Sequence, residues 1–166
     1  DALEYDACLL APGGTRDHAG VPGAEANALD FRHAAAASRI RERLAALAGR
    51  GGRISVVIVG GGVSGVEAVG EILRRHRETE ELTLHVVERE PEILPGLPAA
   101  LARDVRSRCA ALPVRWHTDA PVARLNPKSV TLASGERIPA DLVLWSAGLA
   151  PPPFLGEAGL IPDGRR

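Results

Sequence analysis

The sequence predicts an α/β fold, a doubly wound parallel sheet with a small antiparallel β-meander as one crossover, and three observations support it. Apolar, β-branched segments alternate with segments of helical periodicity along most of the 166 residues. One apolar segment, 54–59, ends in a glycine-rich turn that leads directly into a helical pattern. Short strand-like pieces with turn signals between them, over 121–138, replace one helical crossover.

The first part of the chain predicts one strand and one long helix. Residues 5–11 have the apolar pattern of a strand, which Pro12 and two glycines end. After a loop, Asp30 is a suitable N-cap for a helix over 31–48, closed by Gly49. We therefore expect a strand and a helix before the glycine-rich turn.

The central segment predicts a strand, a helix and a second strand. Residues 54–59 contain no polar side chain except Ser55, which is typical of a parallel strand buried on both faces. Apolar residues then recur at helical spacing over 63–73, followed by basic residues suited to a helix C-terminus. The second strand, 82–87, ends at Glu88. This order is that of a βαβ unit.

The turn of this unit has the pattern G-x-G-x-x-G through Gly60, Gly62 and Gly65. In such a turn the first glycine allows the sharp bend, the second lets a pyrophosphate approach the main chain, and the third lets helix and strand pack closely. The helix N-terminus adds free N–H groups and a partial positive charge. Glu88, about 20 residues further on, is placed to accept hydrogen bonds from an adenosine ribose. The order predicts dinucleotide binding; the alternative is a glycine turn beside a solvated carboxylate.

The second half of the chain completes the predicted sheet. The expected elements are a helix over 98–112, a strand over 113–117, meander strands at 121–125, 129–133 and 137–138, a last strand over 142–145, and an extended proline exit at 151–153. Ligands of such sheets bind outside the carboxyl ends of the strands. The glycine turn, Glu88 and Ala147-Gly148 all fall at such ends, so we expect them to share one rim.

Composition narrows the function. The chain has 45% hydrophobic and 25% charged residues and a net charge of −1, so no excess of basic charge indicates nucleic acid or an anionic membrane as partner. No apolar run approaches the ~20 residues of a membrane span. There is no methionine, which we interpret as the mark of a piece of a longer protein.

Other reactive residues receive structural interpretations. Cys8 and Cys109 lie in apolar patterns and are expected to pack in the core. The five histidines lack metal-ligand spacing, so no metal site is expected. Ser64 lacks the G-x-S-x-G context of a hydrolase nucleophile, and no residue is expected to act as a catalytic acid, base or nucleophile.

Several segments in this order resemble the flavin-dependent pyridine nucleotide-disulfide oxidoreductases. They are YDACLLA at 5–11, GGGVSGVE at 60–67, VE at 87–88, ILP at 93–95 and ADLVLWSAG at 140–148. Within this superfamily the chain is most similar to the type II NADH dehydrogenases, membrane-peripheral flavoproteins that pass electrons from NADH to a quinone. The resemblance covers nearly the whole chain.

The resemblance implies a domain organisation. Residues 16–149 would be an NAD(H)-binding, Rossmann-like domain inserted into a flavin domain, with residues 1–15 and 150–166 as stubs of that flavin domain. FAD would then be bound mainly outside this chain, and a quinone-type acceptor would meet the intact, cytoplasmic or membrane-peripheral protein. In this family the exit strand ends in Ala-Thr-Gly, whereas here Pro12 stands before Gly13, and Pro has no N–H for the usual backbone contacts.

The resemblance also assigns roles by position. The pyrophosphate would be held by Gly60, Gly62, Ser64 and Gly65. Gly61 and Val63 of the same turn would also belong to the cofactor-binding residues. Glu88 would hold the adenosine ribose and favour NADH over NADPH, although Arg89 could accommodate a 2′-phosphate. Glu67 would lie on the nicotinamide side, and Ala147 and Gly148 would let the nicotinamide approach the flavin. Without function, Glu67 is a solvated carboxylate near a helix N-terminus and Ala147-Gly148 is a strand-end turn.

In the intact enzyme, hydride would pass from nicotinamide to flavin, and this chain alone would turn nothing over because the acceptor is missing. Two other functions remain open at this point. The chain could instead belong to another branch of the superfamily, a ferredoxin, thioredoxin or disulfide reductase. It could also be a module in which bound NADH sets conformation and donates no hydride.

Overall fold

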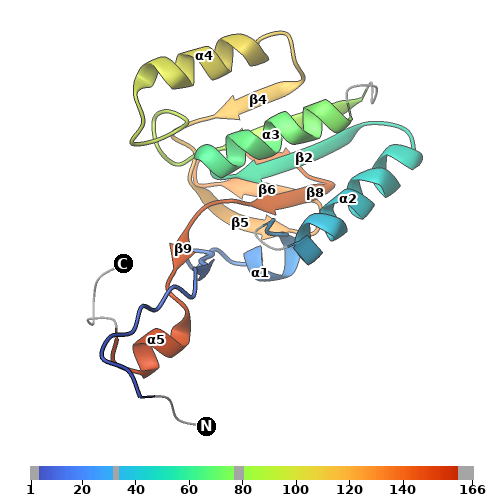
Figure 1. The fold of residues 1–166 in the computed structure, drawn as a ribbon. Helices are drawn as coiled ribbons and strands as arrows, with labels where there is room; N and C mark the ends of the chain where they lie inside the picture. The colour runs from blue at the N-terminus through green and yellow to red at the C-terminus, as the bar shows by residue number, and fades with distance from the viewer. Residues whose placement is uncertain (1–3, 32–33, 77–80, 161–166) are drawn as a thin grey trace. The chain divides into compact units, whose positions relative to one another are not determined.

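The structure is a computed structural model that describes residues 4–31, 34–76 and 81–160 (Figure 1). The chain divides into two compact units, one of residues 18–148 and one that combines residues 1–17 with 149–166. No helix in the described residues is both long and apolar enough to cross a bilayer.

A four-stranded parallel sheet forms the centre of the larger unit (Figure 1). Its strands are β2 (Ile54–Val59), β3 (Leu82–Val87), β4 (Val114–His117) and β8 (Leu142–Trp145), in the order β4-β3-β2-β8. Strand β2 pairs in parallel with β3 on one side and with β8 on the other, so the direction of strand addition reverses at β2. Open α/β sheets bind ligands beside such a reversal, at the carboxyl ends of the strands.

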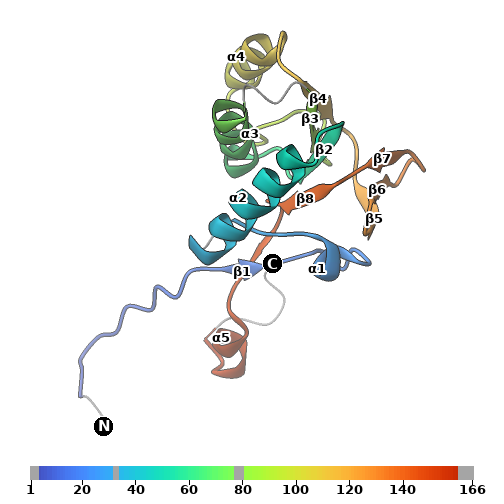
Figure 2. The ribbon, with the colours of Figure 1, turned by 90° about the vertical axis from the view of Figure 1, so that its right-hand side faces the viewer.

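Three helices lie on one side of this sheet, as Figure 2 shows. They are α2 (Ala34–Gly49), α3 (Val63–Arg75) and α4 (Ala99–Cys109). Alternate strand residues such as Val56, Ile58 and Leu84 are fully buried against Val69 and Ile72 of α3 and against the apolar face of α2. The burial of both faces explains the nearly continuous apolar sequence of β2.

An antiparallel meander covers the other side of the sheet (Figure 2). It consists of β5 (Val122–Asn126), β6 (Ser129–Leu132) and β7 (Arg137–Pro139). Val57, Val59 and Trp145 of the sheet pack in one buried cluster with Val130 and Leu132 of the meander. The predicted fold class is thus confirmed, with a sheet layer in place of helices on this face.

Two details of the larger unit differ from the prediction or extend it. A single helical turn, α1 (Ala24–Asn27), interrupts the expected loop, and the Gly23 carbonyl accepts a hydrogen bond from the Asn27 side chain at 2.8 Å. Helix α2 is described from Ala34 onward, and residues 32–33 lie outside the described residues. The assignment of Asp30 as the N-cap of that helix therefore stays a prediction.

In the smaller unit the predicted strand over 5–11 is wrong. No described residue from 4 to 14 belongs to a strand; the strands of this unit are β1 (Thr15–Arg16) and β9 (Leu149–Ala150), an antiparallel pair. Leu9 is 92% exposed, and no hydrogen-bonded neighbour for its backbone is present among the described residues. An apolar sequence forms a strand only beside another strand that takes up its backbone groups.

Two further predictions for this unit need correction. Cys8, expected in the core, is exposed, because no described residue packs over the segment that carries it. The extended proline exit is limited to Pro151 and Pro152, since Pro153 begins the short helix α5 (Pro153–Glu157). The fixed φ of proline suits the first turn of a helix, where its missing N–H has no cost. Residues 161–166 lie outside the described residues.

The packing of the sheet yields a stability prediction. Leu84 is 0% exposed between β2 and β4, so Leu84→Ala should lower the free energy of unfolding by about 2–5 kcal/mol through lost burial and a cavity. Thr83→Ala, at the half-buried neighbouring position, is the control and should cost less than about 1 kcal/mol. Urea unfolding measures both; a loss below about 1 kcal/mol for Leu84→Ala would contradict this core.

Candidate functional site

The turn between β2 and α3 requires glycine at Gly60 for two reasons. Its φ is 105°, in the region that residues with a side chain rarely adopt. A Cβ atom there would also lie 2.7 Å from the amide nitrogen of Ala147, at the end of β8. The turn is thus pressed against the neighbouring strand end, where the Ala147 N–H donates to the Val59 carbonyl at 3.0 Å.

Gly65 and Gly62 differ in what surrounds them. A Cβ atom at Gly65 would lie 1.9 Å from the carbonyl oxygen of Gly60, so the first turn of α3 touches the bend itself and not only the strand. At Gly62 a Cβ atom would meet nothing within 4 Å. The fold therefore explains Gly60 and Gly65 by contacts within the chain, and it leaves open space over Gly62.

The N-terminus of α3 borders this open space. Helix α3 begins at Val63 after the N-cap Gly62, and no side chain caps it. Val63 and Ser64 are exposed, whereas Val69 and Ile72 further along are buried and fix the helix on the sheet. The N–H groups of a first helical turn have no intrahelical acceptor and carry a partial positive charge. This end of the helix is suited to an anionic ligand.

Glu88 lies against the same turn, directly after β3. Its side chain accepts a hydrogen bond from the Gly61 N–H at 2.7 Å and a second from the Glu90 N–H at 3.0 Å. Only 7% of the residue is exposed. Each carboxylate oxygen has a further lone pair, so the group can still accept bonds from hydroxyl groups of a ligand. That the carboxylate also fixes the turn is a role that the sequence did not reveal.

The loop after Glu88 closes the turn from the other side, and beyond Arg89 the sequence predicted no role for it in the site. The Leu94 N–H donates to the Gly61 carbonyl at 2.8 Å, and Ile93 is 1% exposed beneath. Arg106 of α4 donates to the Glu92 carboxylate at 2.7 and 2.9 Å, which lowers the pKa of Glu92. The I-L-P sequence at 93–95 was the available signal, because buried apolar residues in a proline-rich loop indicate an anchored loop.

The remaining predicted site residues lie further from the bend. Arg89 is 76% exposed, and its Nε donates to the Glu90 carboxylate at 3.2 Å. Glu67 is exposed one turn into α3 and lines, together with Ser64 and Phe31, a groove of about 510 Å³ between α2 and α3. Gly148 is exposed with a φ of 71°. The structure thus brings the glycines, Glu88 and Ala147 together, whereas Arg89, Glu67 and Gly148 are exposed.

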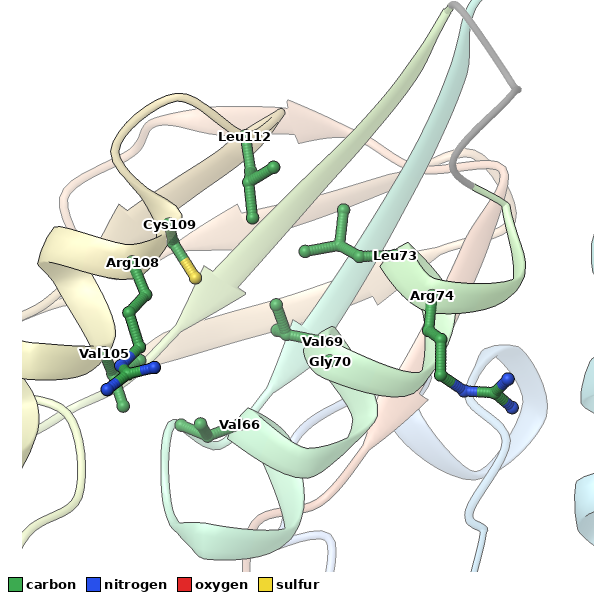
Figure 3. Close-up of a pocket in the computed structure, with 9 residues that line it drawn as sticks. All are labelled: Val66, Val69, Gly70, Leu73, Arg74, Val105, Arg108, Cys109 and Leu112. Carbon is green, nitrogen blue, oxygen red and sulfur yellow. The ribbon is translucent and has the colours of Figure 1, made fainter.

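A second cleft, of about 550 Å³, lies between α3 and α4 and contains no predicted site residue. Figure 3 shows its lining, which is apolar except at Arg74 and Arg108. Each arginine forms an ion pair within its own helix, Arg74 with Glu71 and Arg108 with Asp104.

Cys109 borders this cleft and is half-buried, so its predicted place in the core is only partly correct. Burial raises the pKa of its thiol, which disfavours the reactive thiolate. Across the part of the chain that the structure describes, no three His, Cys, Asp or Glu side chains gather into a group that could hold a metal ion.

Comparison with known proteins identifies a matching family and several related proteins. The family described as pyridine nucleotide-disulphide oxidoreductase matches residues 1–165. Demethylphylloquinone reductase of Synechocystis sp. is 29% identical over 164 residues, which are 96% of this chain and 40% of that protein. An NADH dehydrogenase-like protein of Mycobacterium tuberculosis is 30% identical over 157 residues, which are 89% of this chain and 39% of that protein. The chain thus spans about two fifths of the length of these relatives.

Among solved structures, NDH2 from Plasmodium falciparum in complex with NADH superposes with a TM-score of 0.76. The match covers 90% of this chain and 36% of that one at 16% sequence identity. At this identity the likeness establishes the fold alone.

The close contact at Gly65 yields a second prediction. Gly65→Ala should lower the free energy of unfolding by about 1–3 kcal/mol, because the methyl group would overlap the Gly60 carbonyl oxygen unless the turn moves. Gly70→Ala on the same helix meets no atom within 4 Å and should stabilise by about 0.5–1 kcal/mol. Chemical denaturation of both variants tests this; equal effects would contradict the contact.

Proposed function

Because the chain belongs to the pyridine nucleotide-disulphide oxidoreductase family, we propose that residues 16–149 are the NAD(H)-binding domain of an FAD-dependent NADH dehydrogenase. One observation carries the proposal: the Glu88 carboxylate is hydrogen-bonded to the glycine turn, beside the open space over Gly62. An acid for ribose hydroxyls and a bare backbone for a diphosphate therefore adjoin each other.

The residues of the turn suit a dinucleotide in an ordered way. The diphosphate would lie over Gly62 and receive hydrogen bonds from the uncapped first turn of α3, at Val63 and Ser64. Gly61 would act through Glu88, whose position its N–H fixes. Gly60 and Gly65 would contribute by keeping the turn tight enough for this approach.

The other end of the nucleotide would extend toward β8 and the exposed face of α3. Ala147 and Gly148 present nothing larger than a methyl group to a flat ring, and Glu67 offers a carboxylate to a carboxamide. When bound, the nicotinamide supplies a hydride and FAD accepts it. The chain's own residues bind and orient the donor, and none of them is required to move a proton.

The remaining parts of the proposal concern the intact protein. Residues 1–15 and 150–166 would belong to the flavin domain, and the exposed apolar side chains of Tyr5, Leu9 and Phe154 are consistent with packing against the remainder of that domain. Since the relatives include a demethylphylloquinone reductase, we propose a quinone as electron acceptor and a membrane-peripheral location.

Two alternatives make different predictions. In a ferredoxin, thioredoxin or disulfide reductase the same domain would serve another acceptor, and a C-x-x-x-x-C motif before this segment would mark the disulfide branch. In an NADH-sensing module no flavin would be present. Reduction of a yellow, flavin-containing intact protein by NADH would exclude the sensor.

The diphosphate site can be tested at Gly62. Gly62→Val should leave the fold intact, since a Cβ atom there meets nothing within 4 Å and the φ of −70° suits any residue. It should weaken NADH binding at least about tenfold, because the side chain would occupy the space of the diphosphate. Calorimetric titration with NADH measures the loss, with Gly70→Ala as the matched glycine control. Unchanged affinity in a folded Gly62→Val chain would disprove the site.

The ribose assignment can be tested at Glu88. The chain should bind NADH more tightly than NADPH, because a 2′-phosphate would meet a carboxylate. Glu88→Ala should narrow that gap, although it also removes the acceptor of the Gly61 and Glu90 N–H groups and weakens the turn.

The ratio of the two dissociation constants isolates the ribose effect, since a weaker turn affects both nucleotides alike. Arg103→Gln, an exposed position on α4, is the control. A ratio that stays the same in Glu88→Ala and in the parent would refute the assignment.

A further inference from the structure

Two histidines lie in contact on the meander side of the sheet, next to the candidate site. His85 of β3 and His117, the last residue of β4, approach with 3.0 Å between Nδ1 and Nε2, and their rings stack at 5.3 Å and 21°. His85 is only 8% exposed. A hydrogen bond at this distance needs one nitrogen with a proton and one without, so the contact exists only while at least one ring is neutral.

The main chain of His117 also holds the main chain of Glu88. The Glu88 N–H donates to the His117 carbonyl at 2.8 Å, and the Ala120 N–H donates to the Glu88 carbonyl at 2.9 Å. Strand β4 is at the edge of the sheet, so β3 is its only neighbour within that sheet. A separation of the two rings would therefore displace the end of β3. Glu88 follows that end directly, and its side chain contacts the glycine turn.

The surroundings of both imidazoles favour the neutral form. Burial lowers the pKa of His85 to about 4, and the nearby His117 and Arg115 add to this effect. Burial also lowers the pKa of His117, although the Glu136 carboxylate, 3.8 Å from His117 Nδ1 in the turn before β7, opposes the change. Among the described residues, Arg115 and Glu136 are the charged groups that act on the pair.

We propose that the His85–His117 pair is a positioning element for Glu88 and that its protonation in mild acid loosens the β3–β4 strand end and weakens nucleotide binding. The second half of this inference rests on the proposed function; the first half concerns the fold alone. The pair would make the affinity for nucleotide depend on pH without any contact with the nucleotide.

The sign of the effect follows from linkage. A histidine whose pKa is lower in the closed state than in the open state binds fewer protons when closed. The stabilisation is therefore complete above the ordinary histidine pKa of about 6.5 and is lost as the pH falls from there toward 4. Loosening should begin below about pH 6.5.

The fold-related half is tested by amide hydrogen exchange at Glu88, measured by NMR as a protection factor, which corrects for the intrinsic pH dependence of exchange. In the parent chain this protection should fall about tenfold or more between pH 7 and pH 5. The double variant His85→Asn with His117→Gln keeps a hydrogen-bonding atom near each contact position and cannot titrate. Its Glu88 protection should stay constant; an equal fall in parent and double variant would overturn the proposal.

A single exposed change gives an independent test that does not depend on the folding of the double variant. Glu136→Gln removes the charge that favours protonation of His117 in the closed state, so the closed-state pKa of His117 falls further below its open-state value. The loss of protection in acid should therefore become larger, with the same onset near pH 6.5. His76→Gln, at the end of α3, should leave the curve unchanged. A curve that does not change in Glu136→Gln would overturn the role of the pair.

The nucleotide-related half is tested by NADH titration over the same pH range. The dissociation constant should rise in acid for the parent and change less than about twofold for the double variant. The same rise in both would overturn this half. If no NADH binds at any pH, the proposed function fails while the exchange measurements still decide whether the pair holds Glu88.

Discussion

The hydrogen bond from the Gly61 amide to the Glu88 carboxylate joins the two halves of the βαβ unit at the place where a ligand would bind. This buried hydrogen bond, 2.7 Å from the Gly61 nitrogen to the carboxylate oxygen, connects the bend after β2 to the end of β3. A buried carboxylate must be hydrogen-bonded, and here two backbone amides meet this need. The chain itself therefore holds the acid in place, and the proposed binding of a nucleotide would not require its reorganisation.

Around this bond the chain keeps the turn rigid from three directions. Ala147 contacts it from β8, the Gly60 carbonyl meets Gly65 from the helix, and Leu94 donates to the Gly61 carbonyl from the following loop. Each contact comes from a different segment, and the face over Gly62 stays open. These contacts anchor the short turn to the parallel sheet and so hold it in one conformation.

The sequence predicted the parallel sheet, its helices and the meander because each element carries its own periodicity or turn chemistry. Pattern failed at residues 5–11 and Cys8, where an apolar sequence has no partner strand among the described residues. At the site, residue identity predicted the glycines and Glu88. It could not predict the Leu94 and Arg106 contacts or the histidine pair, since these join residues distant along the chain without a spacing rule.

The three glycines of the G-x-G-x-x-G pattern are present for different reasons. Gly60 and Gly65 are needed for the chain to fold, whereas Gly62 faces empty space. A library randomised at these positions and selected for folding alone should keep the first and third and accept many residues at the second. Only selection by ligand would retain all three, so the substitution pattern at position 62 reports on use, and the patterns at 60 and 65 report on architecture.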